Sequence, residues 1–426
     1  MEDQATVIGD QAGEGGMVPL LRRNRDFLAY TIVLFFSSLA VEILTVAIGW
    51  RIYDISGRAF DLGLVGLVQF IPSFVLVFVT GAVADLFSRR SIIFCCLVSE
   101  FVFTTAIFMV ASGFPAFAQN QVWPILVLIA GLAIGRAFLS PAAQALAPNL
   151  VARHEISTAI ACSTAAWQLS VIAGPAIGGV LYGIAPAFAY RSGLAMVAVS
   201  LIAVLCIKRR EQPRPREQEI TQALIGGFHY MPKEKVVLGA STLDLFAVLL
   251  GSVTVLLPIY ARDILVVGPW GLGLLRAGMG LGALATALYL GWRPIRRRAG
   301  PIMFVTVVIF GAATVCLGLS RSLPLSVLAL VIMGASDMVS VYIREVLIQL
   351  WTPDHLRGRV TALYGLGIIA SNELGGFRAG LVAGLIGAVP ATLLGGTCTV
   401  LVAGLWSRWF PKLRRQDALS RGETTA

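Results

Sequence analysis

Residues 62–112 have the sequence LGLVGLVQFIPSFVLVFVTGAVADLFSRRSIIFCCLVSEFVFTTAIFMVAS, in which two apolar runs, 62–84 and 91–112, flank a short loop with two arginines. About 20 apolar residues satisfy all their backbone hydrogen bonds as a helix in hydrocarbon, so each run predicts one membrane crossing. The 426-residue chain repeats this pattern throughout, with 57% hydrophobic and 13% charged residues. The composition excludes a water-soluble globule and predicts an all-helical integral membrane protein.

Twelve apolar runs of this kind are present. They lie at about 27–50, 62–84, 91–112, 123–146, 160–184, 189–207, 236–260, 270–291, 301–319, 323–342, 361–386 and 389–409. An even number of crossings places both termini on one side of the membrane. The loops on that side hold 22 Lys and Arg residues, against five in the opposite loops. Because cationic loops resist translocation, both termini are predicted to be cytoplasmic, in what we expect to be a bacterial inner membrane.

The longest internal loop, 208–235, separates six spans from six. It predicts a cytoplasmic tail (1–26), an N-terminal half (27–207), the loop itself, a C-terminal half (236–410) and a second cytoplasmic tail (411–426). Segments ALAPNLVARHEISTAI (145–160) and VLIQLWTPDHLRGRVTAL (346–363) occupy equivalent places in the two halves. This layout is typical of a duplicated transporter, whose site lies at the interface of the repeats.

Two motifs carry a family resemblance. The loop after the second span contains Gly81, Asp85, Arg89 and Arg90, and it resembles the signature loop of the major facilitator superfamily. The match covers all twelve spans, although Leu86 and Ser88 replace a basic residue and a glycine of the usual pattern.

The fifth span contains Gly174, Pro175, Gly178 and Gly179, which resemble a motif of exporters that exchange substrate for protons; Ser170 replaces its leading glycine. With GRAFLSPAAQALAPNLV (135–151) and TPDHLRGRVTALY (352–364), the pattern is most similar to the branch of the enterobactin exporter and the macrolide and multidrug efflux proteins.

Both motifs also have a physical interpretation. Asp85 is placed to pair with Arg89 and Arg90 or to face the positive end of a neighbouring helix, which the resemblance identifies as span eleven near Thr361. A contact that forms in only one conformation is a latch; the alternative is a solvated loop. The span-five glycines remove side chains from one face so that another backbone can approach, and Pro175 permits a bend.

Charged residues within spans cost about 2.5–3.5 kcal/mol each at the helix centre, so each needs a partner or an aqueous cavity. Seven such residues lie in spans that the resemblance places around a central cavity: Glu42, Arg136, Asp244, Arg276, Asp337, Glu373 and Arg378. Glu100 lies in a span that is peripheral in the family and is left out of the predicted site.

The depth of each charge along its span predicts its role. Arg136 and Asp337 lie at similar depths and are expected to pair across the cavity. Glu373 and Arg378 are about 140° apart around one helix, so they are not expected to pair. Because loss of hydration disfavours the charged form, a mid-span carboxylate can exchange protons at cellular pH. Glu373 is the first candidate, followed by Asp244 and Glu42.

The sequence therefore predicts a secondary transporter that exports a small amphipathic compound, either a drug or a siderophore, in exchange for protons by alternating access. Lipid or lysophospholipid transport is the second possibility. A membrane enzyme is disfavoured, because the sequence lacks a P-loop, a nucleophile elbow and HExxH. All six cysteines fall in spans without metal-ligand spacing and all three histidines fall in loops, so no metal or cofactor is expected. The basic residues flank spans, so no nucleic-acid partner is expected, and the chain is predicted to act as a monomer.

Overall fold

The computed structural model describes residues 17–114, 120–208, 230–232, 234–295 and 297–417. Its long helices are α3 (Arg25–Ser56), α4 (Ala59–Leu86), α5 (Arg89–Ala111), α6 (Trp123–Leu150), α7 (Ile156–Ile184), α8 (Pro186–Cys206), α10 (Lys235–Gly251), α12 (Gly268–Trp292), α13 (Ala299–Leu319), α14 (Leu323–Trp351), α15 (Asp354–Ile386) and α16 (Ala388–Trp409). Short helical segments are α2 (Met17–Arg23), η2 (Arg153–Glu155), η3 (Thr254–Leu256), α11 (Leu257–Ile259), η4 (Tyr260–Ile264) and α17 (Pro411–Arg414).

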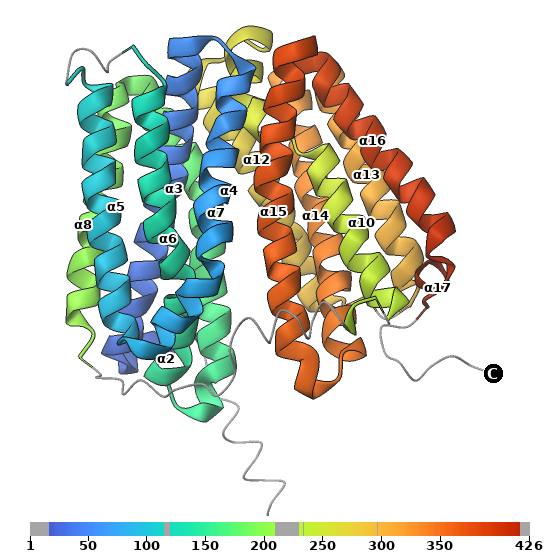
Figure 1. Cartoon of the computed structure of the whole chain (residues 1–426), viewed down its shortest axis with the longest axis horizontal. Coiled ribbons are helices and arrows are strands. Elements are labelled where there is room, and N and C mark those ends of the chain that lie inside the picture. The colour runs from blue at the N-terminus through green and yellow to red at the C-terminus, as the bar shows by residue number, and fades with distance from the viewer. Residues whose placement is uncertain (1–16, 115–119, 209–229, 233, 296, 418–426) are drawn as a thin grey trace, which may run out of the picture.

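Eleven helical segments of the described chain are long and apolar enough to cross a membrane. The twelfth span is α15, which is 33 residues long but less apolar because it carries Asn372, Glu373 and Arg378. Figure 1 shows α15 running alongside the other long helices over the height of the molecule. The predicted all-helical membrane fold is confirmed.

Local chemistry sets the helix ends. Helix α3 begins after Asn24, whose side chain accepts a hydrogen bond of 3.0 Å from the backbone N–H of Phe27. It ends at Gly57, which adopts a φ of 60°, a left-handed conformation that costs glycine little. A helix of 32 residues therefore starts and stops at residues suited to its two ends.

Span seven differs from the expected continuous helix over 236–260. Helix α10 stops at Gly251, the backbone of Ser252 and Val253 leaves helical geometry, and the chain resumes as η3, α11 and η4. Pro258 follows the break within α11; it has no N–H to donate to the carbonyl of Thr254, which disfavours a continuous helix through this segment. The seventh span is therefore a discontinuous helix.

The long helices form two bundles, α3–α8 and α10–α16 (Figure 1). Two pairs of helices pack across the boundary: α4 lies against α15, and α7 lies against α12. These contacts connect segments that are distant in the sequence, and smaller contacts of α3 with α11 and α12 and of α4 with η3 add to the interface between the bundles.

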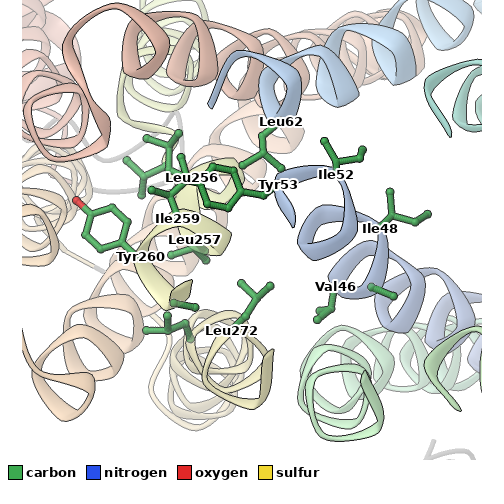
Figure 2. Packing of buried hydrophobic residues seen from close by; sticks show 14 of the residues in the cluster. Val46, Ile48, Ile52, Tyr53, Leu62, Leu256, Leu257, Ile259, Tyr260 and Leu272 are labelled. Atoms are coloured by element: carbon green, nitrogen blue, oxygen red, sulfur yellow. The ribbon is translucent and has the colours of Figure 1, made fainter. Parts of the chain in front are cut away.

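Buried apolar residues form one core that both bundles share and separate cores within each bundle. In the shared core, Ile52 and Leu62 of the first bundle pack with Leu256, Leu257 and Leu272 of the second (Figure 2). This core lies at the end of the molecule opposite the described N-terminal residues.

Toward the other end, the first bundle has its own core, the N-half core, around Phe27, Leu97 and Leu146. The second bundle has the C-half core, around Met303 and Leu347. The bundles are thus joined by apolar packing at one end and have separate cores at the other.

Candidate functional site

A cavity of about 250 Å³ lies between the bundles and borders the shared core. Helices α3, α4 and α6 supply most of its apolar wall, and Val255 and Pro258 of the discontinuous seventh span contribute from the other bundle. Its polar lining consists of Thr45, Gln69, Ser73, Glu100, Arg136, Arg276 and Glu373. A mainly apolar pocket with a few charged groups suits a small amphipathic organic molecule.

Glu100 belongs to this site, contrary to the expectation from its peripheral span. Its side chain is 2% exposed and lines the cavity, accepting a hydrogen bond of 3.2 Å from Ser37. Arg136 of α6 forms an ion pair with it at 3.5 Å. The expected pairing of Arg136 with Asp337 is wrong. Glu100 and Arg136 both lie midway along the neighbouring helices α5 and α6, so their depths match, but depth alone does not identify α5 as the neighbour of α6.

Glu42 and Arg276 form a second, looser pair of opposite charges. Glu42 lies on α3 against Gly174 of α7, and its carboxylate interacts electrostatically with Arg276 of α12 and with Arg136. Within the described residues neither Glu42 nor Arg276 forms a direct ion pair, and Nε of Arg276 is buried without a hydrogen-bond partner. Arg276 therefore presents positive charge to the cavity that a ligand can use.

Glu373 is the acid of the cavity that has no counter-ion. It lies on α15 where that helix crosses α4 at Gly66: a methyl group at Gly66 would come within 2.7 Å of the Glu373 carbonyl oxygen and 3.4 Å of Oε2. Among the residues that the structure describes, its carboxylate makes no hydrogen bond or ion pair. The side chain is half-buried and lines the cavity, in agreement with its predicted position.

Arg378 has a structural partner instead of an ionic one. Its guanidinium donates to the carbonyl oxygens of Leu249 at 3.2 Å, Leu250 at 2.6 Å and Ser252 at 3.2 Å. These carbonyls lie at the end of α10, where the break in the span leaves them without helical partners. As expected from its angle around the helix, Arg378 points away from Glu373.

Asp244 and Asp337 do not line the cavity, although both were predicted to lie around it. They face each other inside the second bundle, where Asp244 of α10 forms an ion pair with Arg344 of α14. Arg344 lies near the end of its span, yet it is 1% exposed and donates a hydrogen bond from Nε to the hydroxyl of Tyr364. The inward orientation of this arginine depends on the rotation of α14, which the apolar pattern of the span does not determine.

The predicted gating loop is described only in part, because the surroundings of Gly81 and the side chain of Asp85 lie outside the described set. Arg90 donates to the carbonyl oxygens of Val204 at 3.1 Å and Leu205 at 2.8 Å, at the C-terminus of α8. It thereby ties the start of α5 to the sixth span within the same bundle, and Arg89 is the first residue of α5.

The predicted exporter motif forms two close helix contacts. Gly178 lies against the backbone of Ile43 in α3, where a methyl group would meet Cα at 2.9 Å. Gly179 faces the second bundle, where a methyl group would meet the Pro269 oxygen at 2.6 Å and Gly273 Cα at 2.8 Å. The expected close approach of backbones is present, and at Gly179 it joins the two bundles. Pro175 lies within α7, which continues unbroken past it.

Comparison with known proteins agrees with this arrangement. The model of the transmembrane secretion effector family matches residues 15–424. The multidrug efflux pump Tap of Mycolicibacterium fortuitum is 26% identical over 400 residues, which cover 89% of this chain and 94% of Tap. The enterobactin exporter EntS of Citrobacter koseri is 25% identical over 410 residues, covering 93% and 94%.

Solved structures show the same fold at low identity. A bacterial homologue of the lysosomal transporter Spinster, inward-facing and occupied, has a TM-score of 0.72 at 16% identity over 91% of this chain and 97% of that one. The D-xylose–proton symporter has a TM-score of 0.71 at 15% identity over 91% and 98%. These relatives are transporters. With its two six-helix bundles around a charged cavity, the chain belongs to the transmembrane secretion effector family of the major facilitator superfamily.

Proposed function

We propose that this protein is a proton-coupled exporter of small amphipathic organic compounds, of the drug or siderophore type, working by alternating access. The observation that carries the proposal is the interbundle cavity with one unmatched acid, Glu373. Multidrug efflux and enterobactin export by the relatives Tap and EntS support a substrate of this class.

The charges of the cavity favour Glu373 as the proton carrier. Glu100 is paired with Arg136, and Arg276 interacts with Glu42, which is not among the residues lining the cavity; Glu373 is the lining acid left without a counter-ion among the described residues. An uncompensated carboxylate in a poorly hydrated site is costly, and a proton removes that cost. Substrate and proton would then compete for one small cavity, as antiport requires.

The packing supports a conformational cycle. The shared core closes the cavity at one end, where Arg262 of η4 forms an ion pair of 3.1 Å with Asp54 at the end of α3 and donates to the Tyr53 carbonyl at 3.2 Å. The hydroxyl of Tyr53 donates to Asp263 across the same boundary. With the cytoplasmic termini that the charge distribution predicts, this end is periplasmic, and the arrangement is an inward-facing state ready to load cytoplasmic substrate.

The test is transport into proteoliposomes of dye-like drugs, a catecholate siderophore and a lysophospholipid, with and without an imposed pH gradient. We expect the gradient to drive accumulation of a drug or the siderophore. In Glu373→Gln, which keeps the shape of the side chain, substrate binding should persist while gradient-driven accumulation is lost.

Glu345→Gln provides the matched control, because Glu345 is an exposed acid on α14. It should transport like the unmodified protein. Accumulation that survives in Glu373→Gln, but is lost in Glu42→Gln, would assign the proton to Glu42 on α3 instead of Glu373. Gradient-independent transport of every compound would contradict proton coupling.

A further inference from the structure

The second bundle contains a polar cluster that the central cavity does not use. Asp244 of α10 and Asp337 and Arg344 of α14 lie within it, and Tyr364 of α15 borders it. It occupies the interior of one bundle instead of the interface between bundles. A cluster of this kind in a membrane is a functional site by default, because apolar residues would fill the space at lower cost.

The charges of the cluster do not balance. Arg344 is committed to Asp244 by an ion pair and to Tyr364 by a hydrogen bond, and its guanidinium carbon lies 5.1 Å from the centre of the Tyr364 ring. Asp337 interacts electrostatically with both Asp244 and Arg344, but forms no hydrogen bond or ion pair with any described residue. Helix α13 faces the cluster with uncharged residues, Thr306, Val307 and Phe310. Two carboxylates and one guanidinium leave a net charge of −1.

A small hollow lies beside Asp337. Its volume is about 10 Å³, the space of a single water molecule or a bare ion, and its wall includes Asp244, Thr306, Ser336 and Ser340. Ser340 is 3% exposed and its hydroxyl has no hydrogen-bond partner in the described structure. A buried hydroxyl left unpaired beside an unpaired carboxylate indicates a ligand that binds oxygen atoms.

We propose that this hollow binds one monovalent cation, H⁺ or Na⁺, with Asp337 as its carboxylate ligand and the hydroxyl of Ser340 as a second oxygen donor. One positive charge neutralises the cluster, whereas a divalent ion would reverse its sign. Carboxylate and hydroxyl oxygens are donors suited to a hard cation. The site is separate from the central cavity and from Glu373, so its occupancy can be measured without transport.

The geometry also gives the cation a mechanical effect. Asp337 and Arg344 are seven residues apart on α14, which places them two turns apart on one face. When the cation leaves, Asp244 and Asp337 both attract the guanidinium of Arg344. This attraction competes with the hydrogen bond that Arg344 donates to Tyr364 of α15. Loading of the site therefore biases the contact between α14 and α15, the helix that carries Glu373.

The experiment uses the full chain purified into lipid nanodiscs without added substrate. Infrared difference spectra are recorded across a pH titration and across a titration of sodium chloride against choline chloride. We expect a protonated carboxylic-acid band that is present in the unmodified protein and in Glu373→Gln but missing in Asp337→Asn. If sodium removes this band, the cation is Na⁺ in competition with H⁺; if only pH removes it, the cation is H⁺.

Ser340→Ala keeps both carboxylates and tests the site where Asp337→Asn fails to fold. It should weaken sodium binding, or shift the titration of the band, by about tenfold or more. The absence of both an Asp337-dependent band and sodium binding throughout the titrations would overturn the proposal. The Glu373→Gln transport assay would be unaffected by that result, so failure here and failure of the proposed function are distinguishable.

Discussion

Arg378 shows how a single charged residue can serve structure inside a membrane. The break in span seven exposes carbonyl oxygens at the end of α10, and hydrocarbon offers them no water. The planar guanidinium reaches three of them at once, at 2.6–3.2 Å. Arg378 therefore compensates the discontinuous helix and keeps the cavity wall formed by Val255 and Pro258 in place.

Arg378→Lys should separate this role from charge. A lysine keeps the positive charge but cannot present several N–H donors in one plane, so we expect the loss of about 1.5–3 kcal/mol of stability. Thermal unfolding in detergent measures the effect. Arg408→Lys, at an exposed position on α16, is the matched control and should leave the melting temperature unchanged. Equal melting of all three proteins would contradict a capping role.

At this scale, depth along a helix and angle around it were predictable, but lateral partners were not. The position of Glu373 at the cavity and its separation from Arg378 follow from residue counting alone. The pairs Glu100–Arg136 and Asp244–Arg344 depend on which helices are neighbours and on how far each is rotated. Hydrophobic periodicity fixes rotation poorly in these spans, because their lipid-facing and protein-facing sides are both apolar.

Among the elements, two glycine contacts join the bundles. Gly179 of α7 meets Gly273 of α12, and Gly63 of α4 meets Gly380 of α15, where a methyl group at Gly63 would lie 3.0 Å from Gly380 Cα. Small residues let helix backbones approach closely, and close contacts without interlocking side chains allow one helix to slide or pivot on another. The contact between Gly63 and Gly380 therefore belongs to the interface between the bundles.

Gly179→Ala should obstruct such a pivot. Its methyl group would meet backbone atoms of Pro269 and Gly273 at 2.6–2.9 Å, and overpacking of this kind costs about 1–3 kcal/mol. Because the contact belongs to this conformation, we expect the variant to favour other states and to transport at least about tenfold more slowly. Gly183→Ala, one turn further along, is the control, since its nearest neighbour would be 4.0 Å away. Equal transport rates for the two variants would contradict a role of the contact between Gly179 and Gly273 in the transport cycle.

The loop before α5 carries a prediction that rests on the sequence. If Asp85 belongs to a cytoplasmic latch, Asp85→Asn should abolish most transport and leave substrate binding measurable, because a latch biases conformations without touching substrate. Binding by equilibrium fluorescence and transport into proteoliposomes would be compared in the same preparation. Normal turnover would leave the loop with the packing role already visible for Arg90 at the end of α8.

The ends of a helix are predictable where an apolar run meets a polar loop. A break inside an apolar run, such as the one in span seven, is not. Hydrophobic length gives the spans, since each apolar run must form one helix in lipid. The break after Gly251 was missed because 236–260 is apolar throughout, so hydropathy registers no interruption. Pro258 disfavours helix around Thr254, but prolines within α4, α6 and α7 leave those helices continuous, so a proline alone does not predict the break.

Orientation belongs to the whole molecule. The ratio of basic residues predicts that Asn120 faces the periplasm and Lys412 the cytoplasm. In a cysteine-free background, Asn120→Cys should react with an impermeant maleimide added outside intact cells, and Lys412→Cys should react only after the membrane is opened. Both positions are exposed in the structure. The reverse labelling pattern would invert the topology and turn the proposed inward-facing state into an outward-facing one.

The three cores have a consequence for how the chain assembles during synthesis. The N-half core draws on residues from Leu20 to Ile207, so it can form before the second bundle has been inserted. The shared core needs Leu256, Leu257 and Leu272 as well, so it forms only afterwards. Two separately expressed fragments, cut between Lys208 and Tyr230, should each enter the membrane and then recombine into an active transporter. Their affinity for each other should reside in the shared core, and Leu257→Asp should weaken their co-purification while leaving the insertion of each fragment intact.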